Sequence, residues 1–117
     1  SPSYNVALTG TLLPGEVFVL CNVNAHADIL AVCDQTWTQA IWNGNDAVEL
    51  VCGGFTIDVL GQIDDNSYIW GEKQTHVRDC LTIHGDDNGY DLYEPTPEWT
   101  IYPVDTFTFL GDHTPCY

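Results

Sequence analysis

Carboxylates are the side chains of this sequence that could most readily do chemistry, and they are densest at Asp86–Asp91, "DDNGYD". An EF-hand calcium loop needs oxygen ligands at positions 1, 3 and 5 and a glycine at position 6. Counting from Asp86 puts a tyrosine at position 5, and counting from Asp87 puts a glycine at position 3, so the motif fails. A turn rich in Asp and Asn accounts for the segment without an ion. Asp86, Asp87 and Asp91 are nevertheless the residues there that would bind calcium.

A second pair of carboxylates belongs to an expected β-hairpin. If Gly53 and Gly54 form a two-residue turn, Glu49 lies directly opposite Asp58 on the polar face. Like charges in that position destabilise a hairpin by up to about 1 kcal/mol. Either a bound cation or screening by solvent ions would relieve the repulsion. Glu49 and Asp58 are therefore a second candidate metal site, and calcium is the cofactor left open. The preceding segment "WNGND" is typical of a turn that needs no ligand.

Catalytic motifs are missing from the sequence. It has no H-E-x-x-H pair, no G-x-S-x-G elbow and no glycine-rich phosphate loop with a lysine. Its three serines lie in no nucleophile context, and the four histidines are dispersed. Cys80 and His84 form a Cys–His pair close in sequence, but on one strand this spacing is typical of half a disulfide beside a surface histidine. We therefore expect no enzymatic activity.

Five cysteines are many for 117 residues. None forms a C-x-x-C pair, which disfavours structural zinc and favours disulfides in an oxidising, extracellular compartment. Cys21 ends an expected strand and Cys33 ends the next segment, so a short loop joins them in the first pairing that we expect. The second pairs Cys116 with either Cys80 or Cys52. The odd count leaves one thiol free or bonded to another chain.

The charge of the sequence excludes two classes of partner. The sequence contains 17 acidic residues and only two basic residues, Lys73 and Arg78, which gives a net charge of −15. Nucleic-acid binding draws most of its affinity from basic side chains, and anionic membranes repel an acidic surface. No apolar run approaches the 18 or more residues that a membrane span needs. We expect protein partners, without nucleic acid and without membrane insertion.

The chain has the length of one domain, and its segments favour an all-β fold. Strands are expected at Tyr4–Gly10, at Glu16–Cys21, on both sides of Gly53-Gly54 and at Thr75–His84, with a strand or turn at Asp105–His113. One short helix of at most two or three turns is expected after Asn24 as its cap. Segments 35–46 and 85–99 are expected as loop and turns. The pattern fits a β-sandwich or an open barrel.

The apolar face of the hairpin is expected to be buried. A regular register around the Gly-Gly turn pairs Cys52 with Phe55, Leu50 with Ile57, and Val48 with Val59. All six side chains lie on one face, which is what a buried sheet face requires.

Several segments in order resemble the lamin tail domain, in its extracellular bacterial and marine-eukaryote form. They are "GTLLPGEVFVLC", "ADILAVCDQT", "NGNDAVELV", "IDVLG", "GDDNG" and "PEWTIYPVDTFTFLGDH", and the similarity runs from about Thr9 to His113. The resemblance implies an immunoglobulin-like β-sandwich without catalytic activity of its own. In secreted proteins such domains are structural or accessory modules, sometimes attached to nucleases or phosphatases.

The resemblance also implies a missing part. Family members begin with an extra pair of strands before the position that matches Ser1, so residues 1–117 form one domain whose first strands come from elsewhere. The exposed edge strand would present Tyr4, Val6 and Leu8 to a segment of the same precursor or to a neighbouring subunit. We therefore expect a subunit of an extracellular filament or surface assembly that is completed by strand addition. The alternative is an accessory binding domain, calcium-dependent or not, of a larger secreted enzyme or adhesin.

Overall fold

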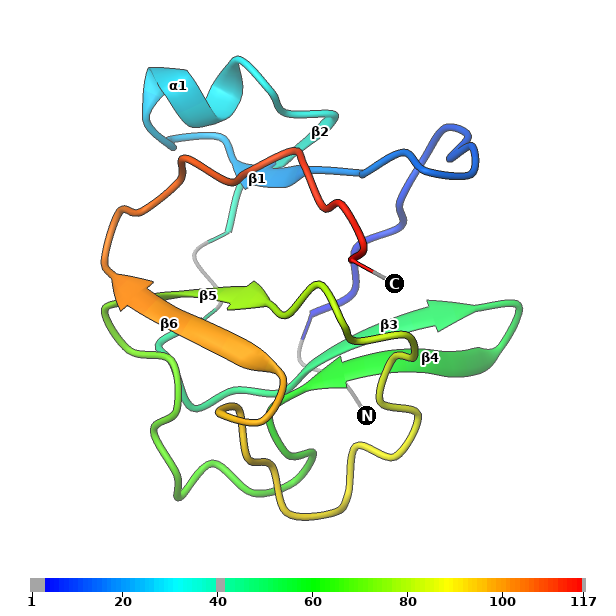
Figure 1. The fold of residues 1–117 in the computed structure, drawn as a ribbon, viewed down its shortest axis with the longest axis vertical. Coiled ribbons are helices and arrows are strands. Elements are labelled where there is room, and N and C mark those ends of the chain that lie inside the picture. The colour runs from blue at the N-terminus through cyan, green and yellow to red at the C-terminus, as the bar shows by residue number, and fades with distance from the viewer. Residues whose placement is uncertain (1–3, 40–41, 117) are drawn as a thin grey trace. The chain divides into compact units, whose positions relative to one another are not determined.

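The computed structural model describes residues 4–39 and 42–116, and the chain divides into two compact units (Figure 1). Unit 1 comprises residues 1–41 with 107–114, and unit 2 comprises residues 42–106 with 115–117. The described residues are mainly strands and loops with one helical turn, so the all-β class is confirmed. Their strands form three two-stranded sheets. The expectation of a single domain stays a prediction.

Unit 1 is built on two short parallel strands, β1 (Leu20–Asn22) and β2 (Gln35–Trp37), joined through α1 (Ala27–Leu30). Strand β2 lies where the sequence predicted a loop. The helix is within the expected length but begins later, because His26 rather than Asn24 caps it: the His26 Nδ1 atom accepts a hydrogen bond from the Asp28 N–H at 3.1 Å.

The expected strand at Tyr4–Gly10 is wrong, and the one at Glu16–Cys21 begins only at Leu20. Residues 4–10 have no neighbouring strand in the described structure. The side-chain amide of Gln35 takes that place: its Nε2 donates to the Ala7 carbonyl at 2.9 Å, and its Oε1 accepts from the Thr9 N–H at 3.0 Å. A parallel strand would bond to the residues on either side of Leu8 in the same way.

Unit 2 contains two antiparallel hairpin-like pairs. Strand β3 (Val48–Cys52) pairs with β4 (Phe55–Leu60), and β5 (Gln74–Arg78) pairs with β6 (Trp99–Pro103). The sequence predicted β5 but extended it too far, and it gave no strand at β6. The side chains of Val59 and Tyr93 are buried.

In unit 1, residues 107–112 form turns rather than a strand, with hydrogen bonds from the Leu110 N–H and the Asp112 N–H.

The hairpin turn at Gly53-Gly54 is confirmed, but the predicted register holds only next to it. Cys52 pairs with Phe55 and Val51 with Thr56, and then the register shifts, so that Leu50 pairs with Asp58, Glu49 with Val59 and Val48 with Leu60. Ile57 is the extra residue of a β-bulge. The bulge takes Asp58 away from Glu49, which removes the opposed carboxylates on which the predicted cation site depended.

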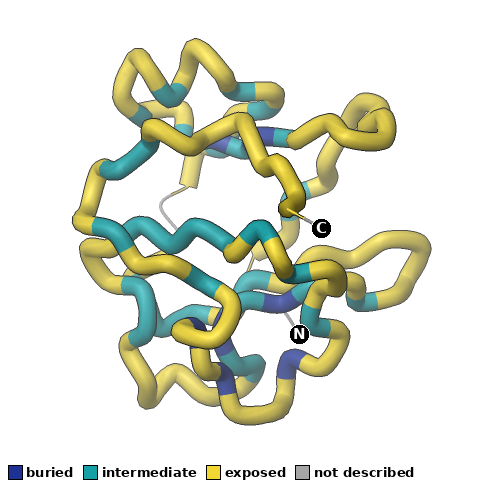
Figure 2. The backbone as a smooth tube through the Cα atoms, in the orientation of Figure 1, coloured by how far each residue is buried: buried dark blue, intermediate teal, exposed yellow. Residues whose placement is uncertain are grey.

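The face of the hairpin that was expected to be buried is largely exposed (Figure 2). Phe55 is 75% exposed, and Leu50 and Ile57 are 44% and 46% exposed. Only Val59, at the base of the hairpin, is fully buried. The prediction of a buried apolar face is therefore wrong for the outer half of the hairpin, because no other described part of unit 2 covers it.

Candidate functional site

The structure joins Cys21 to Cys33 in unit 1 and Cys80 to Cys116 in unit 2. The first expected pairing and one of the two alternatives for the second are therefore present. Cys52 is free and exposed. Two disulfides in so small a protein are consistent with an oxidising, extracellular compartment. Among the described residues, no helix is both long and apolar enough to cross a membrane.

Glu49 and Asp58 each have a partner other than a cation. The Glu49 carboxylate accepts a hydrogen bond from the Thr56 hydroxyl at 2.7 Å. Asp58 forms an ion pair with Arg78. The structure therefore does not bring these two carboxylates together as a site.

The carboxylates of Asp86, Asp87 and Asp91 do not converge either. An oxygen of Asp86 accepts the Asn88 N–H at 3.0 Å in a local turn, and Asp87 and Asp91 are exposed. Within residues 4–39 and 42–116, one group of three metal-type ligands lies close enough to share an ion. It contains Asp79 and the two sulfurs of the Cys80–Cys116 disulfide, which are bonded to each other and do not act as thiolate ligands. Calcium binding stays a prediction.

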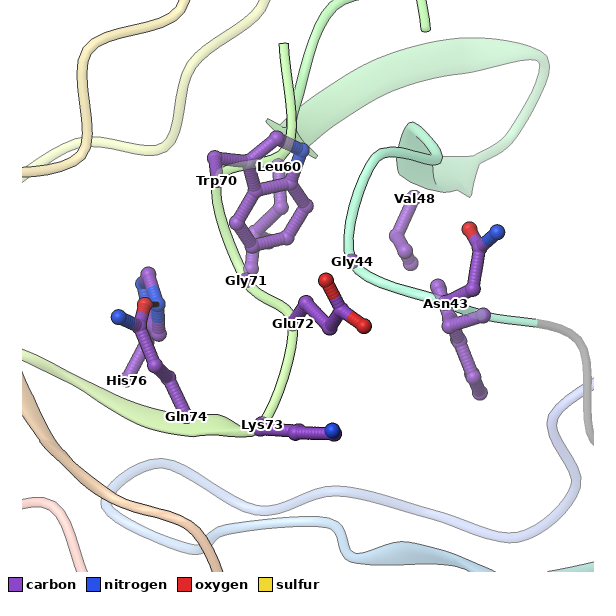
Figure 3. Close-up of a pocket in the computed structure, with 11 residues that line it drawn as sticks. Asn43, Gly44, Val48, Leu60, Trp70, Gly71, Glu72, Lys73, Gln74 and His76 are labelled. Atoms are coloured by element: carbon purple, nitrogen blue, oxygen red, sulfur yellow. Dashed lines mark hydrogen bonds between the residues drawn. The ribbon is translucent and has the colours of Figure 1, made fainter.

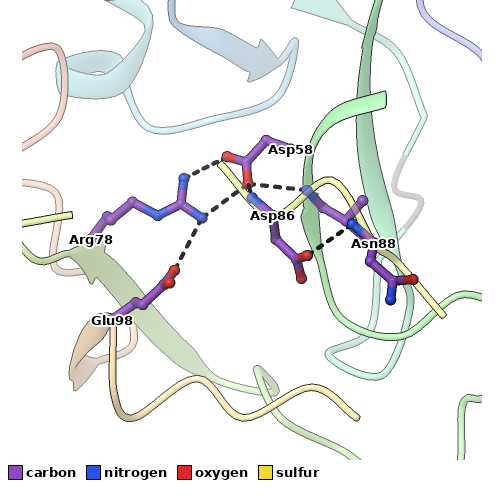
Figure 4. Close-up of polar contacts among 6 residues, drawn as sticks. Asp58, Arg78, Asp86, Asn88 and Glu98 are labelled. Carbon is purple, nitrogen blue, oxygen red and sulfur yellow. Dashed lines mark hydrogen bonds and ion pairs between the residues drawn. The ribbon is translucent and has the colours of Figure 1, made fainter. Parts of the chain in front are cut away.

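Asp58 is instead the centre of a polar network in unit 2 (Figure 4). Both terminal nitrogens of Arg78 donate to its carboxylate, the second at 3.0 Å, and the Asp86 N–H donates to it at 2.8 Å. Glu98 lies 3.6 Å from the same guanidinium. Burial disfavours the charged carboxylate, but the hydrogen bonds from Arg78 and Asp86 outweigh burial and hold the pKa of Asp58 below its ordinary value.

An aromatic cluster adjoins this network. The Trp70 ring meets Tyr93 at 5.1 Å and His76 at 5.5 Å, both edge-on, and His76 lies 6.4 Å from Trp99. The Arg78 guanidinium stacks over Trp99 at 4.5 Å. Burial lowers the pKa of His76 and raises the pKa of Tyr93 to about 12.

A pocket of about 520 Å³ opens beside this cluster (Figure 3). Two loop segments and the base of the β3–β4 hairpin form it: Trp42, Asn43, Gly44, Val48, Leu60, Trp70, Gly71, Glu72, Lys73, Gln74 and His76. Gly44 fastens the two loops, since its carbonyl accepts the N–H groups of both Trp70 and Gly71 at 2.8 Å. A Cβ at Gly44 would collide with the backbone of Glu72, and the φ of Gly44 is +99°. Only glycine allows this approach.

The polar side chains that line the pocket are those of Asn43, Glu72, Lys73, Gln74 and His76. Its lining contains no serine, threonine or cysteine, and His76 Nε2 lies 3.1 Å from Gln74 Oε1. The sequence correctly identified residues 42–46 as a turn, in which Asn43 donates its N–H to Asp46 at 3.0 Å. It missed the pocket, because the second loop is distant in sequence. One feature of the sequence could have indicated the pocket: Lys73, one of only two basic residues, lies three positions after the loop residue Trp70.

The predicted interface residues Tyr4, Val6 and Leu8 lie in unit 1. Tyr4 and Leu8 are 53% and 46% exposed, and Val6 is partly buried. They belong to no strand, so the segment is not the edge of a sheet as expected. Its role as an interface stays a prediction.

Comparison of the chain with protein-family models, with curated proteins and with solved structures gives no match. The resemblance to the lamin tail domain is therefore neither supported nor contradicted by a relative.

Proposed function

We propose that this chain is a non-catalytic extracellular interaction module that assembles with further copies of itself. In this proposal it is a lamin-tail-like, immunoglobulin-like β-sandwich whose sheets are completed by strand addition. The observation that carries the proposal is the outer half of the β3–β4 hairpin. Leu50, Val51, Phe55 and Ile57 are 44% to 75% exposed there. A two-stranded hairpin is marginally stable by itself, and exposed apolar patches mark interaction surfaces.

The distribution of charge supports a second copy as the occupant. Among the stretches that the 17 acidic residues leave uncharged are residues 4–15 and residues 50–57. Both stretches carry exposed apolar side chains, including Leu8, Leu12 and Leu13 in the first and Phe55 in the second. Copies with a net charge of −15 repel each other except where such uncharged surfaces meet.

The backbone supports strand addition at the first of these stretches. Gln35 occupies one side of it through Ala7 and Thr9, whereas the N–H and C=O of Leu8 have no hydrogen-bond partner within the described residues. An edge of the hairpin from another copy fits that vacancy by β-augmentation. A contact between two different surfaces is heterologous, and it generates open chains of subunits unless the rotation closes a ring.

Sedimentation velocity and electron microscopy of the disulfide-intact chain test the proposal. We expect oligomers or filaments that grow as the salt concentration rises from about 0.05 M to about 0.5 M, because screening reduces the repulsion between acidic copies. Phe55→Glu should abolish assembly. Leu92→Glu is the matched control, since Leu92 is 74% exposed and lies outside both uncharged stretches. A wild-type chain that stays monomeric under all conditions contradicts the proposal.

The pocket favours the alternative, an accessory binding domain of a larger secreted protein. That function predicts a monomer at every salt concentration together with a soluble ligand. The two functions are therefore separated by the same sedimentation experiment.

A further inference from the structure

We propose that the pocket formed by residues 42–44 and 70–76 binds a neutral saccharide. This inference goes beyond self-assembly and does not depend on it, because the site uses the loops at the base of the hairpin rather than its exposed tip. Three features of the pocket lead to this class of ligand: its indole rings, its unpaired polar side chains and its balance of charge.

Indole rings supply the apolar part of the site. Trp42, which is 49% exposed, and Trp70 both line the pocket, and Figure 3 shows the ring of Trp70. Sugars present a face of C–H groups that packs flat on such a ring. The ring contributes a large apolar contact at little cost in conformational entropy. An indole that is half exposed in the free protein is thus a natural platform for a sugar ring.

Polar side chains supply the groups that bind hydroxyls. Within the part of the chain that the structure describes, the side chains of Asn43, Glu72 and Lys73 make no hydrogen bond or ion pair. Glu72 and Lys73 extend from one loop toward the side of the pocket that carries Asn43 (Figure 3). Together they offer an amide, a carboxylate and an ammonium group, which serve both as donors and as acceptors. A sugar hydroxyl requires both roles from its partners.

The balance of charge excludes the other ligand classes. A phosphate or another anion would meet one ammonium beside a carboxylate, on a chain with a net charge of −15. A metal ion would meet one carboxylate, and this pocket holds no group of three ligands among the described residues. A purely apolar ligand would bury Asn43, Glu72 and Lys73 without partners, which is costly. A neutral ligand that has many hydroxyl groups and one apolar face satisfies every group present.

The loops are already held in place for binding. The two hydrogen bonds to the Gly44 carbonyl fix one loop against the other. Lys73 has a φ of +53°, a left-handed conformation that is unfavourable for a lysine. Strained backbone of this kind is concentrated at functional sites, and here it sets the direction of the one ammonium group in the pocket.

Isothermal titration calorimetry with a set of purified hexasaccharides tests the inference. The neutral probes are the hexamers of cellulose, laminarin, mannan, xylan and chitin, and the acidic probe is oligogalacturonate. We expect at least one neutral hexamer to bind with a Kd of about 1 mM or tighter. Trp42→Ala and Glu72→Ala should each weaken that binding about tenfold, from the loss of the stacked ring and of a charge-assisted hydrogen bond.

Tyr90→Ala is the control, because Tyr90 is a 66% exposed aromatic residue that does not line the pocket. It should leave the affinity unchanged, and circular dichroism confirms that each variant is folded. The inference is overturned if no neutral hexamer binds at about 10 mM, if only the acidic probe binds, or if Trp42→Ala binds as tightly as wild type. None of these results alters the sedimentation of wild type or of Phe55→Glu, so this inference and the proposed assembly fail separately.

Discussion

Removing the carboxylate of Asp58 should cost more stability than removing any other acidic side chain of unit 2. Asp58 and Arg78 have side chains that are only 19% and 18% exposed. The substitution Asp58→Ala takes away both hydrogen bonds from the guanidinium and leaves the Asp86 N–H without its acceptor. Glu98 cannot replace it, because it lies 3.6 Å from one guanidinium nitrogen and is itself 47% exposed.

The size of the effect follows from these contacts. Hydrogen bonds to charged groups contribute about 1.5–3 kcal/mol, and breaking a buried ion pair costs about 3–5 kcal/mol. Since the pair is partly exposed, we expect a loss of about 3 kcal/mol for Asp58→Ala, or a fall in Tm of about 10 °C. Glu98→Ala should cost about 0.5 kcal/mol, as exposed ion pairs do.

Denaturant unfolding of Asp58→Ala, Arg78→Ala and the double variant measures the pair directly, with Glu98→Ala as the control. A coupling energy of about 1–3 kcal/mol is expected. The difference between Asp58→Ala and wild type should also depend on pH. Because the folded-state pKa of Asp58 is lowered, its stabilisation is complete above the ordinary value near 3.8 and is lost as the pH falls through the folded-state value. A coupling near zero, or an equal cost for Glu98→Ala, would refute the reasoning.

Three further predictions follow from single residues. Burial lowers the pKa of His76 below its ordinary value of 6.5. The stability that its neutral form contributes is therefore complete above about pH 6.5 and is lost as the pH falls through the lowered pKa. In thermal melts between pH 7 and about pH 5, the Tm of His76→Phe should depend on pH less than the Tm of wild type does. Gly44→Ala should destabilise by about 3 kcal/mol or more, against about 1 kcal/mol for Gly53→Ala, whose Cβ meets nothing, and urea unfolding measures both. Native mass spectrometry after maleimide treatment should show one label, on Cys52. In assembled material that thiol should be protected from the reagent. A label on any other cysteine contradicts the disulfide assignment.

The sequence predicts best where local chemistry decides the structure. Two adjacent glycines with positive φ, Gly53 and Gly54, make the hairpin turn almost independently of their surroundings. A short loop likewise suffices to bring Cys21 to Cys33. The bulge at Ile57 does not follow from local chemistry: it moves Asp58 away from Glu49, and Asp58 pairs with Arg78, 20 positions further along the chain.

Elsewhere, contacts distant in sequence decided the outcome. The alternation at Tyr4–Gly10 is typical of a strand, yet a strand needs a backbone neighbour, and here the neighbour is the side chain of Gln35. Strand β6 was missed because prolines and an Asn-Gly pair precede it, although they end before Trp99. The pocket was missed because it depends on a contact between residues distant in sequence: Gly44 and Glu72 meet only in the folded chain.

One face of β5 connects the proposed saccharide site to the ion pair. Side chains two apart on a strand share a face, so His76 and Arg78 point the same way, and both contact Trp99. His76 lines the pocket, whereas Arg78 is held by Asp58. Without Asp58, the guanidinium loses the partner that keeps it over the indole, and Trp99 loses the contact with that guanidinium. We therefore expect saccharide affinity to fall in Asp58→Ala, through Arg78, Trp99 and the pocket residue His76, although Asp58 does not line the pocket.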